Sequence, residues 1–172
     1  MLNKLKRMTQ LELFGKEMAK EGNTTRKMLA IVPADKFDWK PHPKSMSIRH
    51  LTAHIAELPG WAGMVLHTDE LDFAKMDYKP THFETTAQLM ELFEKTLADG
   101  VQELANGDES TLQQPWTLRN GEQVYSTEPK ADVIRMSFFH FIHHRAQLGV
   151  FLRLLDIPIP GSYGPSADDT SF

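Results

Sequence analysis

Two histidines four residues apart, His140 and His144, lie in the strongly apolar segment 137–147. On a helix, side chains at positions i and i+4 share one face, so both imidazoles can reach a single metal ion. Neighbouring imidazoles buried among phenylalanines need polar partners or a metal to offset their desolvation. His143 lies on a different side of the helix, and we expect it to be partly exposed or at an interface.

A second pair with the same spacing, His50 and His54, lies on an amphipathic segment far upstream. Helix geometry allows either histidine to face the bundle axis. We favour His54 because it follows Leu51 by three residues on the apolar side, whereas His50 follows Arg49 at a more polar helix start. Three imidazoles suit zinc, nickel, copper or iron, and they leave a coordination position open to water or substrate.

Two polar residues near these histidines are candidate catalytic groups. Glu57, one turn after His54, could act as a general base, accept an imidazole N–H, or simply be a surface carboxylate. Gln147, seven residues after His140, could orient metal-bound water or form a hydrogen bond within the bundle. The sequence leaves these alternatives open.

Composition excludes several classes of chemistry. The 172 residues include 19 basic and 23 acidic side chains, a formal charge of −4 that offers no electrostatic footprint for nucleic acid or an anionic membrane. Because the chain has no cysteine, disulfides, cysteine-based metal sites and catalysis by a protein thiol are excluded. The first eight residues are charged and lack a following apolar region, and no stretch reaches the roughly 18 apolar residues of a membrane span. We expect one cytoplasmic domain over residues 1–172.

Helical periodicity predicts two helices in the first part of the chain. The first runs from Thr9 to Ile31, with Gly22 as a possible kink. The second starts at the N-cap Ser47 and continues to about His67, bent near residues 55–58 because Pro59 removes a backbone donor.

The second part of the chain is predicted to contain a hairpin and two more helices. One helix covers 83–105 and ends at Asn106-Gly107 by C-cap chemistry. Asn120-Gly121 predicts a two-residue turn in a β-hairpin over 116–125. Thr127 then caps, and Pro129 opens, a fourth helix that runs to about Leu155. The connections 34–46 and 68–82 are expected to be irregular, and the tail 161–169 to drape over the surface.

These elements predict an all-α, up-and-down four-helix bundle with a long crossover that carries the small β-hairpin. The fourth helix is apolar on nearly every side, so it must be central in the bundle or partly covered by a second subunit. We favour a homodimer.

Four stretches of the sequence form a characteristic set: residues 47–61, the block His140-x-x-x-His-Arg-x-Gln147, residues 152–160, and the Tyr-Gly-Pro-Ser-Ala-Asp-Asp sequence at 163–169. Together they resemble the DinB-like superfamily of metalloenzymes. The resemblance spans nearly the whole chain. It implies a DinB-like four-helix bundle, usually dimeric, with a divalent metal held by three histidines that map onto His54, His140 and His144. Ala146 stands where the family often has glycine, which we do not expect to disturb the ligands.

The same superfamily includes bacillithiol S-transferases and mycothiol-dependent isomerases, so the resemblance implies metal-activated chemistry on a low-molecular-weight thiol. A bound zinc or nickel ion lowers the pKa of a coordinated thiol or water and makes a nucleophile near neutral pH. The sequence therefore favours a metal-dependent transferase or hydrolase acting on a small molecule. The alternative is a non-catalytic stress or scaffold protein in which the ion ties two helices together. A metal-free, proton-linked switch ranks last.

Overall fold

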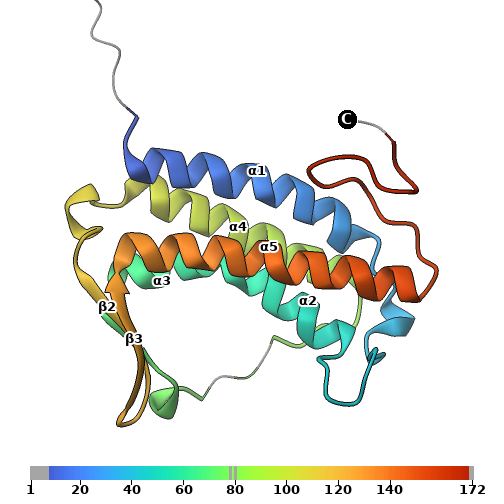
Figure 1. The fold of residues 1–172 in the computed structure, drawn as a ribbon, viewed down its shortest axis with the longest axis horizontal. Helices are drawn as coiled ribbons and strands as arrows, with labels where there is room; N and C mark the ends of the chain where they lie inside the picture. The colour runs from blue at the N-terminus through green and yellow to red at the C-terminus, as the bar shows by residue number, and fades with distance from the viewer. Residues whose placement is uncertain (1–7, 78, 80, 171–172) are drawn as a thin grey trace, which may run out of the picture.

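A computed structural model of the chain describes residues 8–77, 79 and 81–170. The charged N-terminal segment 1–8 therefore lies outside the described residues except for Met8. Long helices pack side by side as four rods, and α2 and α3 together make up one of these rods (Figure 1). The predicted all-α four-helix bundle is confirmed. The helices are α1 (Gln10–Ala30), α2 (Ile48–Glu57), α3 (Trp61–His67), α4 (Thr86–Asn106) and α5 (Lys130–Leu154), with short 3₁₀ turns η1 (Ala34–Lys36), η2 (Leu58–Gly60), η3 (Phe73–Lys75) and η4 (Glu109–Thr111).

Contacts at the helix ends define the directions of the rods. Thr86, at the start of α4, donates its hydroxyl hydrogen to the carbonyl of Val32, just after α1 (2.7 Å), so these two helices are antiparallel. Phe14 and Phe138, near the beginnings of α1 and α5, pack edge to face 5.6 Å apart, so these helices run parallel. The rod of α2 and α3 also runs opposite to α1 (Figure 1). The directions are therefore up, down, down, up and not strictly alternating as predicted, because the connection 68–85 returns the chain along the bundle before α4 begins.

Reciprocal capping boxes start both of the 21-residue helices. Thr9 and Glu12 cap α1, which begins one residue after the predicted start and continues without a break through Gly22. Thr85 and Gln88 cap α4, which begins three residues later than predicted. The expected start, Phe83, is instead buried against another ring, because its apolar side chain gains more from the core than from the helix surface.

The predicted second helix is broken rather than bent. α2 ends at Glu57, and Pro59 lies in the 3₁₀ turn η2 before α3 begins, because a proline inside a helix removes a hydrogen bond and clashes with the preceding turn. The interruption begins at Leu58, the last residue of the range in which the bend was predicted. Gly100 of α4 packs against this turn so closely that a Cβ there would lie 2.4 Å from the carbonyl oxygen of Pro59. This contact sets the distance between α4 and the rod that carries His54.

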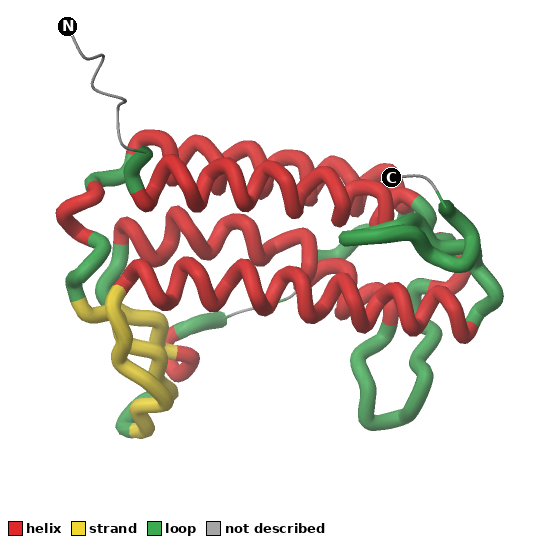
Figure 2. Tube along the Cα trace, turned by 45° about the horizontal axis from the view of Figure 1, so that its top comes forward, coloured by secondary structure: helices red, strands yellow, loops and turns green. Residues whose placement is uncertain are grey.

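A three-stranded sheet projects from one end of the bundle (Figure 2). β2 (Pro115–Asn120) and β3 (Gln123–Pro129) form the predicted hairpin, and β1 (Glu70–Asp72) pairs with β2 in parallel. The expectation that 68–82 is irregular was therefore wrong for β1, because three residues are too few to show alternation in the sequence. The hairpin lies between α4 and α5, where the sequence placed it, whereas the connection that runs back along the bundle is 68–85.

The hairpin turn is Gly121-Glu122, one residue later than predicted, because Asn120 still pairs with Gln123. Gly121 has a φ of 56°, which favours glycine, and its N–H donates to the carboxylate of Asp72 (2.8 Å). This hydrogen bond joins the hairpin to the strand β1.

Two predicted helix-end devices take other forms. Thr127 lies in β3, where its hydroxyl is 3.0 Å from that of Thr117, so it does not cap α5. Pro129 occupies the N-cap position, and the helix starts at Lys130. α4 ends before Gly107 as predicted, but Gly107 has a φ of −64° rather than a left-handed conformation. Its small size instead leaves room for Leu11, which a Cβ would approach to 3.0 Å.

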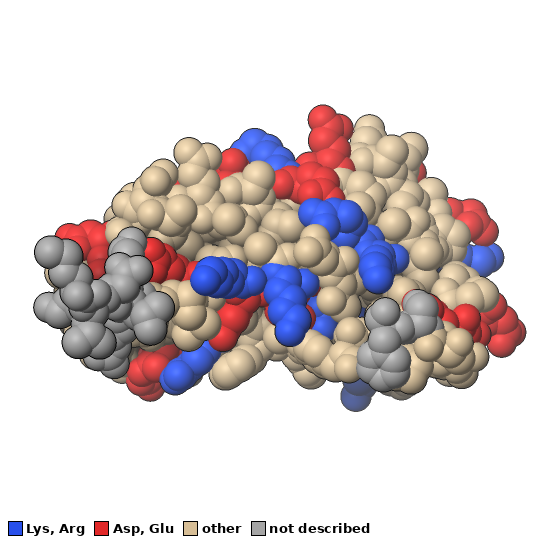
Figure 3. Space-filling view, turned by 90° about the horizontal axis from the view of Figure 1, so that it is seen from above, with Lys and Arg blue, Asp and Glu red and all other residues tan. Residues whose placement is uncertain are grey.

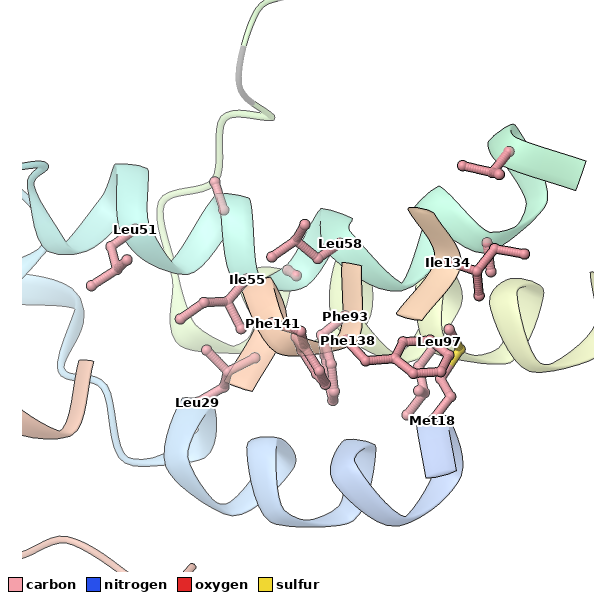
Figure 4. Close-up of a cluster of buried hydrophobic side chains, with 14 of the residues drawn as sticks. Met18, Leu29, Leu51, Ile55, Leu58, Phe93, Leu97, Ile134, Phe138 and Phe141 are labelled. Carbon is pink, nitrogen blue, oxygen red and sulfur yellow. The ribbon is translucent and has the colours of Figure 1, made fainter. Parts of the chain in front are cut away.

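The buried side chains form one continuous hydrophobic cluster between the rods (Figure 4). Phe93 and Phe141 stack at its centre with ring centroids 6.2 Å apart. The loop after α1 is held by its aromatic residues, with Phe37 buried. α5 is not buried all round, because Phe139, Val150 and Leu154 have exposed fractions of 62%, 59% and 60%.

The C-terminal tail is irregular, as predicted, but it is held to the bundle by specific contacts. The Asp168 carboxylate pairs with Arg153 and accepts the backbone N–H of Ile159 (3.0 Å). The Tyr163 hydroxyl donates to Glu21 of α1 (2.9 Å), which also pairs with the buried guanidinium of Arg145 (2.7 Å). These bonds give a physical reason for the Tyr-Gly-Pro-Ser-Ala-Asp sequence.

Two surface properties bear on possible partners. Within the described residues, we find no helix with the length and apolar character that crossing a bilayer requires. On the face seen in Figure 3, basic and acidic side chains are interspersed over a largely uncharged surface.

We predict that Gly100→Ala destabilises the protein by about 1–3 kcal/mol, because the new methyl group would overlap the Pro59 carbonyl. Urea unfolding measures the effect. Gly15→Ala in α1 is the matched control, since its Cβ would meet no atom closer than 3.9 Å. We expect that change to be neutral or stabilising by up to about 1 kcal/mol. Equal effects of the two substitutions would contradict the role assigned to Gly100.

Candidate metal centre

Packing of α2 against α5 brings His54, His140 and His144 together. Their ring centroids are separated by 4.5–4.9 Å. One donor nitrogen from each residue lies within 4.8 Å of the others, so the cluster could hold a metal ion. The Nε2 atoms of His54 and His140 are 3.4 Å apart. That is long for a hydrogen bond, but it matches the separation of about 3.3 Å between two nitrogens bound to one tetrahedral zinc ion.

Gln147 sets the tautomer of His144, that is, which ring nitrogen carries the hydrogen. The Nδ1 atom of His144 lies 2.7 Å from the amide oxygen of Gln147, which can only accept a hydrogen bond, so Nδ1 carries the proton. The Nε2 atom then has a free lone pair. It is buried and has no hydrogen-bond partner among the described residues. Leaving such an atom unpaired in the interior costs free energy, and a bound cation would remove that cost.

Burial keeps all three imidazoles uncharged. The pKa of His54 is lowered to about 4, mainly by burial and in smaller part by the neighbouring rings of His144 and His140. Burial is also the main cause of the lowered pKa values of His140 and His144. At neutral pH the three rings are therefore in the unprotonated form that metal coordination requires.

The other two candidate histidines lie outside this cluster. His143 is exposed, as expected, with its ring centroid 5.1 Å from that of His144. His50 is exposed one turn before His54 on α2. The structure thus brings His54, and not His50, to the pair on α5.

The two candidate catalytic residues have different surroundings. One carboxylate oxygen of Glu57 accepts hydrogen bonds from the backbone N–H (3.1 Å) and the hydroxyl (2.7 Å) of Thr81. Glu57 therefore holds the α3–α4 connection against α2. Gln147 makes a hydrogen bond within the bundle, to His144, which was one of the alternatives left open by the sequence.

A cavity of about 390 Å³ opens beside the histidine cluster. Lining residues include His50, His54 and Glu57 of α2, Trp61 and Met64 of α3, and His140 of α5. Its remaining walls come from the loop before α2, from β1 and η3, and from β2. Sequence reasoning missed these walls because their residues belong to separate elements and share no spacing.

The fold and the site together define the class of protein: a four-helix bundle whose three clustered histidines could hold a metal ion. A model of the DinB family matches residues 1–170, so the chain belongs to the DinB family. The match and the histidine cluster agree with the family and the three residues that the sequence resemblance indicated.

Solved structures of DinB-like proteins share the fold. One from Bacillus subtilis is 18% identical and has a TM-score of 0.68, covering 87% of this chain and 96% of its own. One from Bacillus cereus is 18% identical, with a TM-score of 0.65 and coverages of 87% and 95%. A DinB family protein from Exiguobacterium sibiricum is 19% identical, with a TM-score of 0.66 and coverages of 90% and 98%. Among curated proteins, none matches the chain.

We predict that metal-free protein loses stability as the pH falls from about 6.5 to about 4. The folded-state pKa of His54 is about 4, below its ordinary value of 6.5, so the unfolded chain takes up the proton first and acid favours unfolding. His54 should contribute on the order of 1 kcal/mol between pH 7 and pH 5, after allowance for its partial exposure.

Urea unfolding of chelator-treated protein across this pH range measures the slope. His54→Gln should flatten it, because this substitution removes the group whose pKa is lowered. A slope that His54→Gln does not alter would refute the assignment.

Proposed function

We propose that this chain is a metal-dependent enzyme, a transferase or hydrolase acting on a small molecule. His54, His140 and His144 would hold a zinc or nickel ion through their Nε2 atoms. The observation that supports this most is the buried, unpaired Nε2 of His144 beside two other uncharged imidazoles. A metal ion bound there would lower the pKa of a coordinated thiol or water.

The two candidate catalytic residues take different roles in this proposal. Gln147 positions His144 by accepting its Nδ1 hydrogen, which fixes the ring orientation and the tautomer. Glu57 is the carboxylate among the described residues that line the cavity, and we assign it as the base that accepts the proton of the attacking thiol or water. Its hydrogen bonds with Thr81 hold one carboxylate oxygen in place.

The proposed nucleophile is an external low-molecular-weight thiol, or water. The chain has no cysteine of its own, and its sequence resembles a superfamily that includes enzymes using such thiols. The proposed compartment is the cytoplasm, where thiols are kept reduced. The proposed functional unit is a single domain over residues 1–172.

Metal binding tests the proposal directly. We expect one zinc or nickel ion per chain by elemental analysis after loading. His144→Gln should weaken binding by more than about 100-fold, because even residues that only orient a ligand contribute 10- to 100-fold. His143→Gln is the matched control and should bind normally, since His143 lies outside the cluster. Absence of stoichiometric metal after loading would refute the proposal.

Access to the ion separates an enzyme from a protein in which the ion only ties α2 to α5. We expect added 2-mercaptoethanol or azide to change the absorption spectrum of the cobalt-loaded protein, because a catalytic site keeps an open position. A purely structural ion would stabilise the fold against urea without any change in the spectrum.

A second copy of the chain is the partner that we propose for the exposed face of α5. Phe139, Val150 and Leu154 are exposed on this face, and we take these large apolar side chains as the contacts with the second copy. Val150 and Leu154 also line a cavity of about 610 Å³ between α5 and the tail, which a partner side chain could enter. The unit that we propose is a homodimer.

Charge on this face should separate the subunits. We expect Phe139→Glu with Val150→Glu to convert a dimer into a folded monomer, because two carboxylates would be desolvated at the interface. Sedimentation equilibrium measures the mass, and circular dichroism checks the helix content. Leu13→Glu, at an exposed apolar position on α1, is the control and should leave the dimer intact. A monomeric wild-type protein at all concentrations would refute the dimer.

A further inference from the structure

The cavity beside the histidine cluster is rich in methionine. Met46, Met64, Met76 and Met136, four of the nine methionines in the chain, line it from four different segments. Methionine is unbranched and polarizable, so it adapts to ligands of different shape. We call this space the methionine cavity.

Its mouth is formed by exposed apolar side chains. Met46, Phe73, Met76 and Met136 have exposed fractions between 36% and 43% although they surround one opening. Single exposed apolar residues are normal, but several around one cavity mark a ligand-binding site. Its volume of about 390 Å³ suits a small molecule.

Charge limits the kind of ligand that the methionine cavity accepts. No lysine or arginine is found among the described residues that line it, and Glu57 is the acidic one. A polyphosphate or polycarboxylate would therefore lose its hydration without gaining cationic partners. The polar groups lie along one side, where His50, His54 and His140 line the wall.

We propose that the methionine cavity binds the apolar body of the substrate, a neutral or singly charged small molecule with an aromatic or branched alkyl group. The polar, reacting group of that molecule would face His54 and His140. The orientation rests on the proposed metal function, whereas the affinity for an apolar group does not. Because methionine adapts, groups of similar size but different shape should bind with similar affinity.

The sheet is part of this binding site. Leu71 of β1, Phe73 of η3 and Leu118 of β2 form a wall opposite the helices. Trp61 of α3 connects the cavity to the cluster, since its ring centroid lies 6.5 Å from that of His140. The small sheet therefore gives the cavity a side that four helices alone would leave open.

Binding to metal-free protein tests the cavity independently of any ion. In full-length protein with ¹³C-methyl methionine, benzyl alcohol should shift the signals of the four cavity methionines and not the other five. Pyrophosphate should shift none of the four. Supporting this inference requires both results. Uniform shifts of all nine signals, no shift with benzyl alcohol, or equal shifts with pyrophosphate would overturn it.

A matched pair of metal-binding probes tests the orientation. Benzohydroxamate and acetohydroxamate carry the same metal-binding group, so the phenyl ring should make the first bind zinc-loaded protein at least about tenfold more tightly in calorimetry. Met46→Gln with Met136→Gln should remove most of that difference without changing zinc affinity. Met8→Gln, an exposed methionine outside this cavity, is the control.

The possible failures are distinguishable. Equal affinities of the two hydroxamates in a zinc-loaded protein would overturn the cavity assignment and leave the metal proposal intact. Failure to bind zinc would instead overturn the proposed function, and the benzyl alcohol titration would still decide whether the cavity takes an apolar group.

Discussion

Desolvation of three imidazoles between α2 and α5 is the constraint on which the rest of the structure depends. The main cause of the lowered pKa values of His54, His140 and His144 is burial, so each ring is kept uncharged by its surroundings. Hydrogen bonding offsets only part of the free-energy cost of burying these rings, since Gln147 accepts one ring hydrogen and the Nε2 of His144 stays unpaired. A bundle that holds lone pairs in this state is preorganised for a cation.

Holding these rings in place requires the two rods to keep a fixed separation and direction. The η2 turn at Pro59 ends α2 just after the segment with His54, and Gly100 allows α4 to contact that turn directly. On α5, the residue after His144 is Arg145, whose buried guanidinium pairs with Glu21 of α1 and lies over the ring of Tyr163. Contacts with α4 therefore fix the rod that carries His54, and contacts with α1 and the tail fix α5 next to His144.

The cavity beside the histidines also depends on residues outside the four rods. β1 in the long connection pairs with the hairpin, and the sheet supplies one wall of the cavity beside the histidines. Glu57 fastens the same connection through Thr81. The site thus combines a rigid helical side that carries the imidazoles with an apolar side built from loops and strands.

The sequence by itself determined where the helices lie, the cap at Ser47, and the i, i+4 pair His140 and His144, because these features depend on local spacing and propensity. It could only favour His54 over His50, since both satisfy the same helical geometry. Tertiary structure decided that choice, the strand β1 and the cavity walls, because each arises from contacts between residues far apart in the chain. Such contacts leave no periodic signal in the sequence.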